Sequence, residues 1–202
     1  MKKPPRKVTL SAVRAQAAEC RACPLWRPAT QTVFGEGARR ATLMLVGEQP
    51  GDAEDISGHP FVGPAGRLLD RALSAAGIDR RHVYLTNVVK HFKFEPRGKR
   101  RIHKKPRWTE IHACSPWIDA ELQLVRPQVV VCLGATAAQA LIGRDFKVTV
   151  RRGQPVVSSI APIVMATVHP SSVLRERDAQ ERHAAFERFV LDLRAAVRLL
   201  EQ

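Results

Sequence analysis

Four short runs of predominantly apolar residues constrain most strongly what this chain can fold into. They occupy residues 41–47, 83–87, 129–133 and 163–168, and segments with helical character separate them. A strand that is apolar on both faces has to be covered on both faces, which is the arrangement of a parallel sheet between helices. We therefore predict an α/β fold, a three-layer α/β/α sandwich with a central four-stranded, mostly parallel sheet.

The length of the chain bounds the number of domains. Its 202 residues suffice for one sizeable core and are few for two. The sequence contains neither an internal repeat nor a low-complexity linker. We expect residues 1–8 to be a mobile basic tail and residues 9–202 to form a single domain.

Capping and breaking residues place the helices. Ser11 is a suitable N-cap for a helix that ends near residue 19, and Pro64 opens a helix that Gly77 stops. Further helices are predicted over about residues 109–125, 136–141 and 178–200, and a small hairpin over residues 147–157. Between residues 90 and 107 we expect a long loop without regular structure.

The charge balance favours an anionic partner. Lys and Arg number 33 against 19 Asp and Glu, so the formal net charge is +14. Such an excess attracts nucleic acid first and an anionic membrane surface second, although a basic protein can also bind neither. No apolar stretch is long enough to span a bilayer, and no apolar signal segment follows the basic start. We expect a cytoplasmic protein without a membrane partner.

Positive charge is concentrated between Lys90 and Arg107. Nine basic residues and one acidic residue lie there, with Phe92, Phe94 and Trp108 interleaved or adjacent. Cations with aromatic rings suit phosphate neutralisation and base stacking on single strands, and the alternative is a solvated surface loop. His103 lies among these cations, which should keep its imidazole neutral and nucleophilic. From the residues alone, a phosphate contact or no role at all is the favoured interpretation of His103.

Polar side chains follow three of the predicted strands. Glu48 and Gln49 follow the first, Asn87 ends the second, and His169 and Ser171 follow the fourth. The carboxyl ends of parallel strands meet at one edge, so these side chains should converge on one crevice. A fixed carboxylate can stabilise a cation, and an amide can bind a donor beside an acceptor. Each residue alone could equally be a cap or a loop contact.

Four cysteines can form one metal site. Cys20 and Cys23 have the spacing of two thiolates that bind one centre from a single turn, and Cys114 and Cys132 complete a four-ligand set for zinc or an iron–sulfur cluster. Disulfides are not expected in a cytosolic protein. A redox pair remains an alternative for the first two cysteines, and a core position for Cys132, which lies in a predicted buried strand.

Together these motifs resemble the uracil-DNA glycosylase superfamily, in particular its iron–sulfur family-four type and the UdgX branch of that type. The resemblance extends from Cys20 to about Arg175. Residues 47–51 (GEQPG) are similar to the first motif of the family, and residues 169–171 (HPS) to the second. Residues 58–66 (GHPFVGPAG) are similar to its uracil-stacking segment.

The resemblance implies a role for each residue. The cysteines would bind a [4Fe–4S] cluster rather than zinc. Uracil would stack on Phe61 beside Gly47 and hydrogen-bond Asn87. His169 would stabilise the departing base, Glu48 the cation at C1′, and Gln49 would orient water or the sugar. Arg101 and Ser171 would contact phosphate.

Two features point to the UdgX branch. Gln49 stands where family-four enzymes typically have alanine, and residues 99–103 (KRRIH) form an inserted loop. The implied function is excision of uracil from DNA, preferably single-stranded, and covalent trapping of C1′ by His103. A cytoplasmic, nucleoid-associated monomer would perform it. The alternatives are a turning-over family-four-like glycosylase and a non-enzymatic iron–sulfur module that binds single-stranded DNA.

Overall fold

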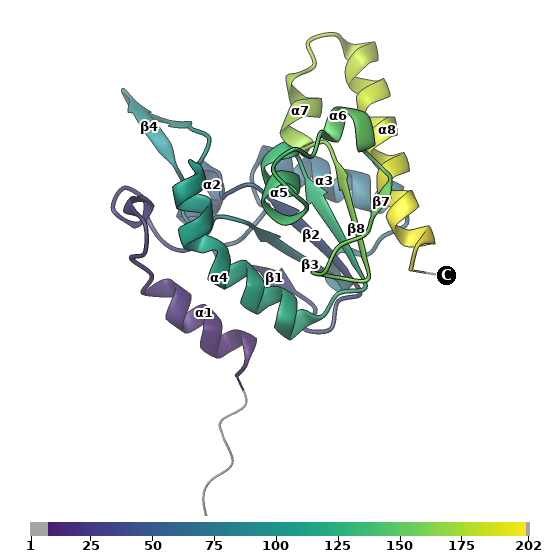
Figure 1. Cartoon of the computed structure of the whole chain (residues 1–202). Coiled ribbons are helices and arrows are strands. Elements are labelled where there is room, and N and C mark those ends of the chain that lie inside the picture. Colours follow the sequence, from purple (N-terminus) through teal and green to yellow (C-terminus); the bar gives the residue numbers. More distant parts are fainter. Residues whose placement is uncertain (1–7, 201–202) are drawn as a thin grey trace, which may run out of the picture.

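The computed structural model describes residues 8–200 (Figure 1). The tail predicted for residues 1–8 lies outside this range except for its last residue. The single domain over residues 9–202 stays a prediction.

The four predicted strands are all present and form the centre of one sheet. They are β2 (Leu43–Gly47), β3 (Val83–Asn87), β6 (Val129–Leu133) and β8 (Ile163–Thr167). Neighbouring members run parallel. The register pairs Gly47 with Asn87, so β2 and β3 end level with each other at the carboxyl edge.

The predicted number of strands is wrong, because the sheet has six. Two edge strands, β1 (Glu36–Gly37) and β7 (Pro155–Val156), pair antiparallel with β3 and β8. The order is β1-β3-β2-β6-β8-β7, so the sheet is mixed. Strands of two residues are too short to give a hydrophobic pattern in the sequence.

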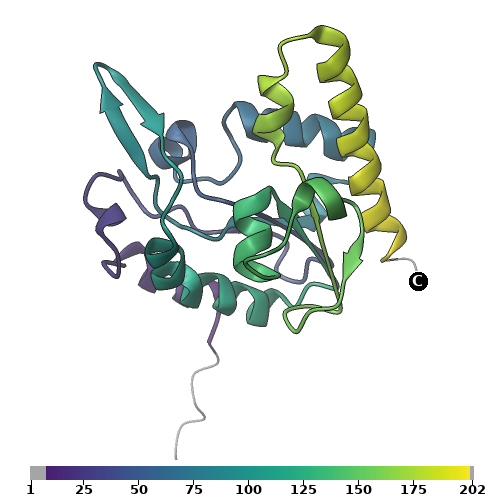
Figure 2. The same ribbon diagram turned by 45° about the horizontal axis from the view of Figure 1, so that its top comes forward.

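Helices cover both faces of the sheet (Figures 1 and 2). Met44 and Val46 pack with α4 (Trp108–Val125) and α5 (Ala135–Leu141) in one core cluster. The alternate residues Leu43 and Leu45 pack with helices on the opposite face, which are α3 (Pro64–Ala75) and α8 (Ala179–Arg198). The alternation of strand side chains thus produces two cores and three layers.

Other predicted boundaries are confirmed with small changes. The first helix is α1 (Leu10–Ala18), capped by Thr9 instead of Ser11 because Thr9 Oγ1 accepts a hydrogen bond from Ala12 N at 3.2 Å. The hairpin predicted over residues 147–157 is wrong, because α6 (Val148–Arg151) precedes β7 there. The sequence analysis did not predict the short helices α2 (Asp52–Ser57), α7 (Pro170–Arg175), η1 (Pro24–Trp26) and η2 (Arg80–His82).

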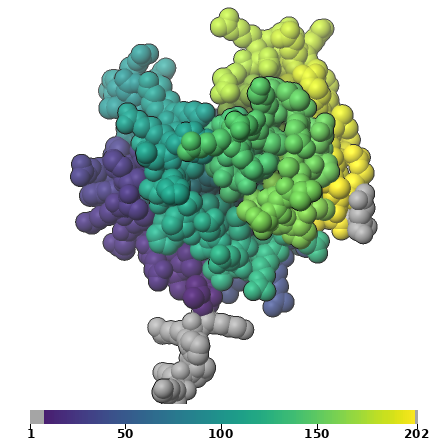
Figure 3. Space-filling view, in the orientation of Figure 1, coloured from purple at the N-terminus to yellow at the C-terminus, as the bar shows by residue number. Residues whose placement is uncertain are grey.

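The long basic loop is also corrected, because it contains a β-hairpin. β4 (Phe94–Arg97) pairs antiparallel with β5 (Arg100–His103), and Gly98 in the turn has a φ of +57°. This conformation suits glycine, and two-residue hairpin turns require it. The hairpin projects from the body of the molecule, as does the end that contains α7 and the start of α8 (Figures 2 and 3). None of the helices within residues 8–200 is long and apolar enough to cross a membrane.

Candidate active site

Gly47, at the end of β2, lets two predicted site residues approach each other. A Cβ atom at this position would overlap Oδ1 of Asn87 and would lie 2.7 Å from Cζ of Phe61. Any larger residue would therefore displace one of them. The structure brings Gly47, Asn87 and Phe61 into one small region, as the sequence predicts.

The amide of Asn87 faces this region without a partner. The residue is 3% exposed, and within residues 8–200 no group hydrogen-bonds its side chain. The following backbone is fixed, since Val88 N donates to Gly47 O and Val89 N to Glu48 O, both at 3.0 Å. An amide at this position with unused donors and acceptors is suited to a polar ligand.

Phe61 adopts a strained backbone conformation. Its φ is +57°, a left-handed value that costs a bulky residue on the order of 1–3 kcal/mol. The strain is maintained by Arg80, whose Nη2 lies 3.3 Å from the carbonyl oxygens of both Pro60 and Phe61. The ring of Phe61 is 6.5 Å from that of His169, centroid to centroid.

His169 is held as a neutral hydrogen-bond donor. Ser171 N donates to His169 Nδ1 at 3.2 Å, and Ser171 Oγ lies 2.8 Å from the same atom. Burial, assisted by the charges of His103 and Arg175, lowers the pKa of His169 to about 4. With Nδ1 used as an acceptor, the ring proton is on Nε2. The Ser171 hydroxyl is thus engaged with His169, and Arg175 Nη1 also donates to it at 3.2 Å.

Glu48 lies between Thr136 and His103. Thr136 Oγ1 donates to Oε2 of Glu48, and Nε2 of His103 is 3.5 Å from Oε1. The hairpin histidine therefore joins the residues at the strand ends. The sequence analysis missed Thr136, although it follows the third predicted strand by three residues and so belongs to the same edge of the sheet.

Comparison with known proteins identifies the family. Residues 34–194 match the Uracil DNA glycosylase superfamily. The chain belongs to the uracil-DNA glycosylase superfamily. A Type-4 uracil-DNA glycosylase of Thermotoga maritima is 37% identical over 183 residues, which are 90% of this chain and 92% of that protein. Another, of Sulfurisphaera tokodaii, is 36% identical over 174 residues, covering 82% and 76% of the two chains. A Type-5 uracil-DNA glycosylase of Pyrobaculum aerophilum is 35% identical over 97 residues, covering 47% and 39%.

In this glycosylase, Gln49 anchors the hairpin. Its Nε2 lies 3.1 Å from the carbonyl oxygens of both Lys93 and Lys104, and Lys93 N donates to its Oε1 at 3.2 Å. The side chain expected to orient water or sugar is therefore engaged at the base of the hairpin. Alanine at this position could form none of these bonds.

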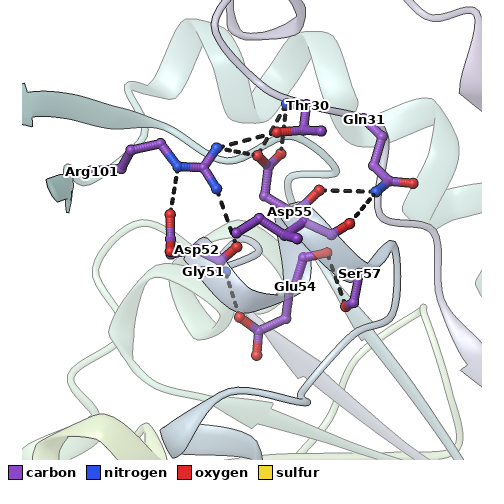
Figure 4. A network of polar contacts seen from close by, with 9 residues as sticks. Thr30, Gln31, Gly51, Asp52, Glu54, Asp55, Ser57 and Arg101 are labelled. Atoms are coloured by element: carbon purple, nitrogen blue, oxygen red, sulfur yellow. Dashed lines mark hydrogen bonds and ion pairs between the residues drawn. The ribbon is translucent and has the colours of Figure 1, made fainter. Parts of the chain in front are cut away.

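Arg101 also holds the hairpin in place. Its guanidinium donates to Asp52 Oδ1 at 2.5 Å and to Asp55 Oδ2 at 2.6 Å (Figure 4). It also lies over the rings of Phe92 and Phe94, 5.5 and 5.1 Å from their centroids. These contacts link β5 to α2, and the phosphate contact expected of Arg101 stays a prediction. The sequence analysis missed both aspartates.

A second acidic residue of α2 holds the Phe61 loop. The carboxylate of Glu54 accepts hydrogen bonds from Gly51 N at 3.1 Å, Val62 N at 3.0 Å and Gly63 N at 2.8 Å. It is drawn with the Arg101 network in Figure 4. The spacing Gly51-x-x-Glu54 is that of a capping box, a signal by which the sequence could have revealed it.

Three of the four cysteines are coupled electrostatically in the glycosylase. Burial raises the pKa of Cys23 and raises that of Cys114 to about 11, and the neighbouring cysteine thiols contribute in both cases. Two thiols accept hydrogen bonds, Cys20 Sγ from Trp117 Nε1 at 3.2 Å and Cys114 Sγ from Lys90 N at 3.3 Å. In iron–sulfur proteins, hydrogen bonds to the ligand sulfurs help to set the reduction potential of the cluster.

Cys132 does not join this group. It is wholly buried in β6, and burial alone, with no contribution from the other thiols, raises its pKa to about 12. Its position agrees with the alternative of a core cysteine. In the part of the chain that the structure describes, no three histidine, cysteine or acidic residues are already arranged to hold a metal ion. Thiols are the donors that an iron–sulfur cluster requires, and Cys20, Cys23 and Cys114 are the expected ligands that influence one another.

Proposed function

We propose that this protein excises uracil from DNA and then captures the sugar carbon C1′ covalently through His103. The observation that carries the proposal is the distance of 3.5 Å between His103 Nε2 and Glu48 Oε1. Glu48 is the carboxylate suited to face a cationic C1′. A nucleophile beside it is therefore in position to attack the same carbon.

Uracil binding uses the region around Gly47. A uracil flipped out of the strand would stack on Phe61 and hydrogen-bond the amide of Asn87. Uracil offers an acceptor, O4, beside a donor, N3–H, whereas cytosine offers the reverse pair. An amide fixed in one orientation therefore selects uracil.

Cleavage breaks the bond between C1′ and N1, and the electron pair leaves with the base. His169 Nε2–H donates a hydrogen bond to the uracil anion, and the low pKa of His169 keeps the donor neutral. The carboxylate of Glu48, oriented by Thr136, stabilises the positive charge that develops at C1′.

Capture follows when a lone pair of the His103 imidazole forms a bond to C1′. The other ring nitrogen then loses its proton to solvent, and the uracil anion takes up a proton from solvent. A group held next to the carbon has a large advantage over mobile water. Gln49 and Arg101 provide that placement, because they fix both ends of the strand that contains His103.

A turning-over uracil-DNA glycosylase is the second candidate. The relatives named Type-4 uracil-DNA glycosylase match nearly the whole chain, and they support this candidate better than covalent capture. In that case water attacks C1′ and His103 contacts DNA. A binding module without catalysis is disfavoured, because binding alone does not require Glu48, Asn87 and His169 to converge.

Exposed cations make a single DNA strand the substrate we propose. Arg97, Lys99 and Arg100 are exposed at the tip of the hairpin. Flexible single strands can follow such a projection and neutralise several phosphates at once.

A [4Fe–4S] cluster would be bound by Cys20, Cys23 and Cys114. We propose His91 as the fourth ligand, because it is a buried imidazole next to Lys90, whose amide donates to Cys114 Sγ. The cluster would link the N-terminal segment to α4. It would support the fold or DNA docking and would take no part in cleavage.

One experiment separates the candidates. The protein is incubated with a uracil-containing single-stranded oligonucleotide and analysed on a denaturing gel. Capture predicts a protein–DNA band that is lost in His103→Ser and retained in Ile102→Ser, a matched change on the same strand. Released uracil with abasic DNA and no band establishes turnover. Absence of both products leaves a binding module.

A further inference from the structure

Lys90 and Glu121 form an ion pair inside the protein that the proposed chemistry does not use. Their side chains are 1% and 0% exposed, and Nζ lies 2.5 Å from Oε2. Burying two charges carries a desolvation penalty of several kcal/mol for each ion, so such a pair is weak evidence of a purely stabilising role. The contacts of the pair indicate another role.

All three Nζ protons of Lys90 have acceptors. They are Glu121 Oε2, Thr86 Oγ1 at 2.6 Å and the backbone carbonyl of Asn87 at 2.7 Å. An ammonium group has three donors, so this set is complete. Lys90 therefore hydrogen-bonds the backbone of Asn87, the residue that faces the proposed uracil site.

Glu121 is itself held on every side. Its Oε1 accepts from Gly35 N at 2.8 Å and from Tyr84 Oη at 3.2 Å, and its Oε2 accepts from Thr86 Oγ1 at 2.8 Å. These partners come from the β1 and β3 region, whereas Glu121 belongs to α4. The carboxylate is thus a fixed point against which Lys90 is placed.

The peptide group between Asn87 and Val88 is consequently fixed at both ends. Its carbonyl oxygen accepts from Lys90 Nζ, and its N–H donates to Gly47 O at 3.0 Å. The orientation of this plane determines the direction in which Asn87 projects its side chain. Gly47 is also the residue that Asn87 Oδ1 closely approaches.

We propose that the Lys90–Glu121 pair is a positioning device that holds the Asn87 amide in the orientation that selects uracil. This inference rests on the proposed function, in which Asn87 binds the base. Lys90 and Glu121 touch neither substrate nor the reacting atoms and act through Asn87. Misplacement of a binding group by about 1 Å can lower a rate by about 100-fold.

A double-mutant cycle tests the proposal. Uracil excision is measured under single-turnover conditions for the unmodified protein, Lys90→Met, Asn87→Ala and the double variant. We expect Lys90→Met to lower the rate on the order of 10- to 100-fold in the unmodified background and to change it little in the Asn87→Ala background. An equal loss in both backgrounds would mean general disruption and would overturn the proposal.

The same cycle distinguishes failure of the proposed function. If Asn87→Ala excises uracil at the unmodified rate, binding of the base by Asn87 is wrong and the inference falls with it. If Asn87→Ala is impaired and Lys90→Met is not, base binding stands and the positioning role alone is overturned.

A second variant keeps the test valid if Lys90→Met does not fold. Lys90→Met leaves the Glu121 charge buried and unpaired, whereas Lys90→Met with Glu121→Gln removes both charges. The paired variant should fold and show the same coupling to Asn87, and additive losses would again overturn the proposal.

Arg152→Met is the matched control, since it breaks the partly buried pair with Asp192. It should lower the melting temperature without changing excision, and coupling of this control to Asn87→Ala would refute a specific effect.

Discussion

The side-chain amide of Gln49 donates to the backbone carbonyl of Lys104, the residue that immediately follows His103. A residue that follows β2 thereby controls the placement of a histidine more than fifty residues away in the chain. The link therefore affects capture by His103 and not excision of the base. The residues proposed for excision, which are Glu48, His169 and Asn87, do not depend on it.

Gln49→Ala should therefore impair capture more than excision. Loss of the hydrogen bonds to Lys93 and Lys104 frees the base of the hairpin, and the local placement of His103 is lost. The ratio of abasic product to covalent adduct should rise on the order of tenfold or more. A ratio equal to that of the unmodified protein would contradict the anchoring role.

Arg101→Ala should destabilise the fold. It leaves the carboxylate of Asp55, which is 0% exposed, without its cationic partner, and breaking such a pair costs about 3 kcal/mol. Denaturant unfolding measures the effect. Arg100→Ala, at an exposed position next to it, should change the free energy of unfolding by less than about 0.5 kcal/mol. Similar losses in both variants would show that Arg101 is not specifically required.

The stability of the protein should fall as the pH drops from about 6.5 towards 4. The folded protein keeps His169 neutral down to a pKa of about 4, whereas the unfolded chain protonates it near its ordinary value of 6.5. The unfolded state then binds the extra proton, so acid favours unfolding. His169→Gln should flatten this dependence in melting experiments, while His82→Gln, at an exposed position, should not. An unchanged slope in His169→Gln would contradict the assignment.

Cys132→Ala should keep the visible absorbance and the iron content of the cluster. Cys114→Ser should lose both, because Cys114 lies with Cys20 and Cys23 whereas Cys132 lies apart in β6. Loss of iron in Cys132→Ala would instead place all four cysteines in the ligand set. His91→Ser tests the fourth ligand, and full iron content in that variant would exclude His91.

Neutralising Arg97, Lys99 and Arg100 should weaken binding to single-stranded DNA and reduce its dependence on salt. The slope of log affinity against log salt should fall by about 0.7 for each phosphate contact that is lost. Arg39 and Arg40 are exposed near the amino end of β2, at the opposite edge of the sheet, and their replacement by Ser serves as the control. Equal changes in slope for the two sets would contradict a hairpin-specific contact.

The sequence predicts the centre of this fold better than its periphery. β2, β3, β6 and β8 are buried on both faces, which leaves a continuous apolar signal, whereas β1 and β7 are too short to leave one. The β4–β5 hairpin was missed because most of its strand residues are exposed and half are charged, so that they leave no apolar run.

The same distinction holds for the site. Glu48, Asn87 and His169 could be placed because each lies at or just beyond the carboxyl end of a predictable strand. The partners of Gln49 and Arg101 lie 44 to 55 residues away in the chain, and no local pattern identifies them. The separation of Cys132 from the other thiols likewise depends on tertiary packing.

The two ends of the hairpin lie side by side in space, since Lys104 N donates to Lys93 O at 3.0 Å. A segment with adjacent ends can be inserted or deleted without moving the chain on either side. The proposed capture step would therefore need two local features, the hairpin that contains His103 and the anchoring side chain of Gln49. The same junction makes residues 94–103 a unit whose transfer into a relative would show whether the proposed capture of C1′ moves with the hairpin.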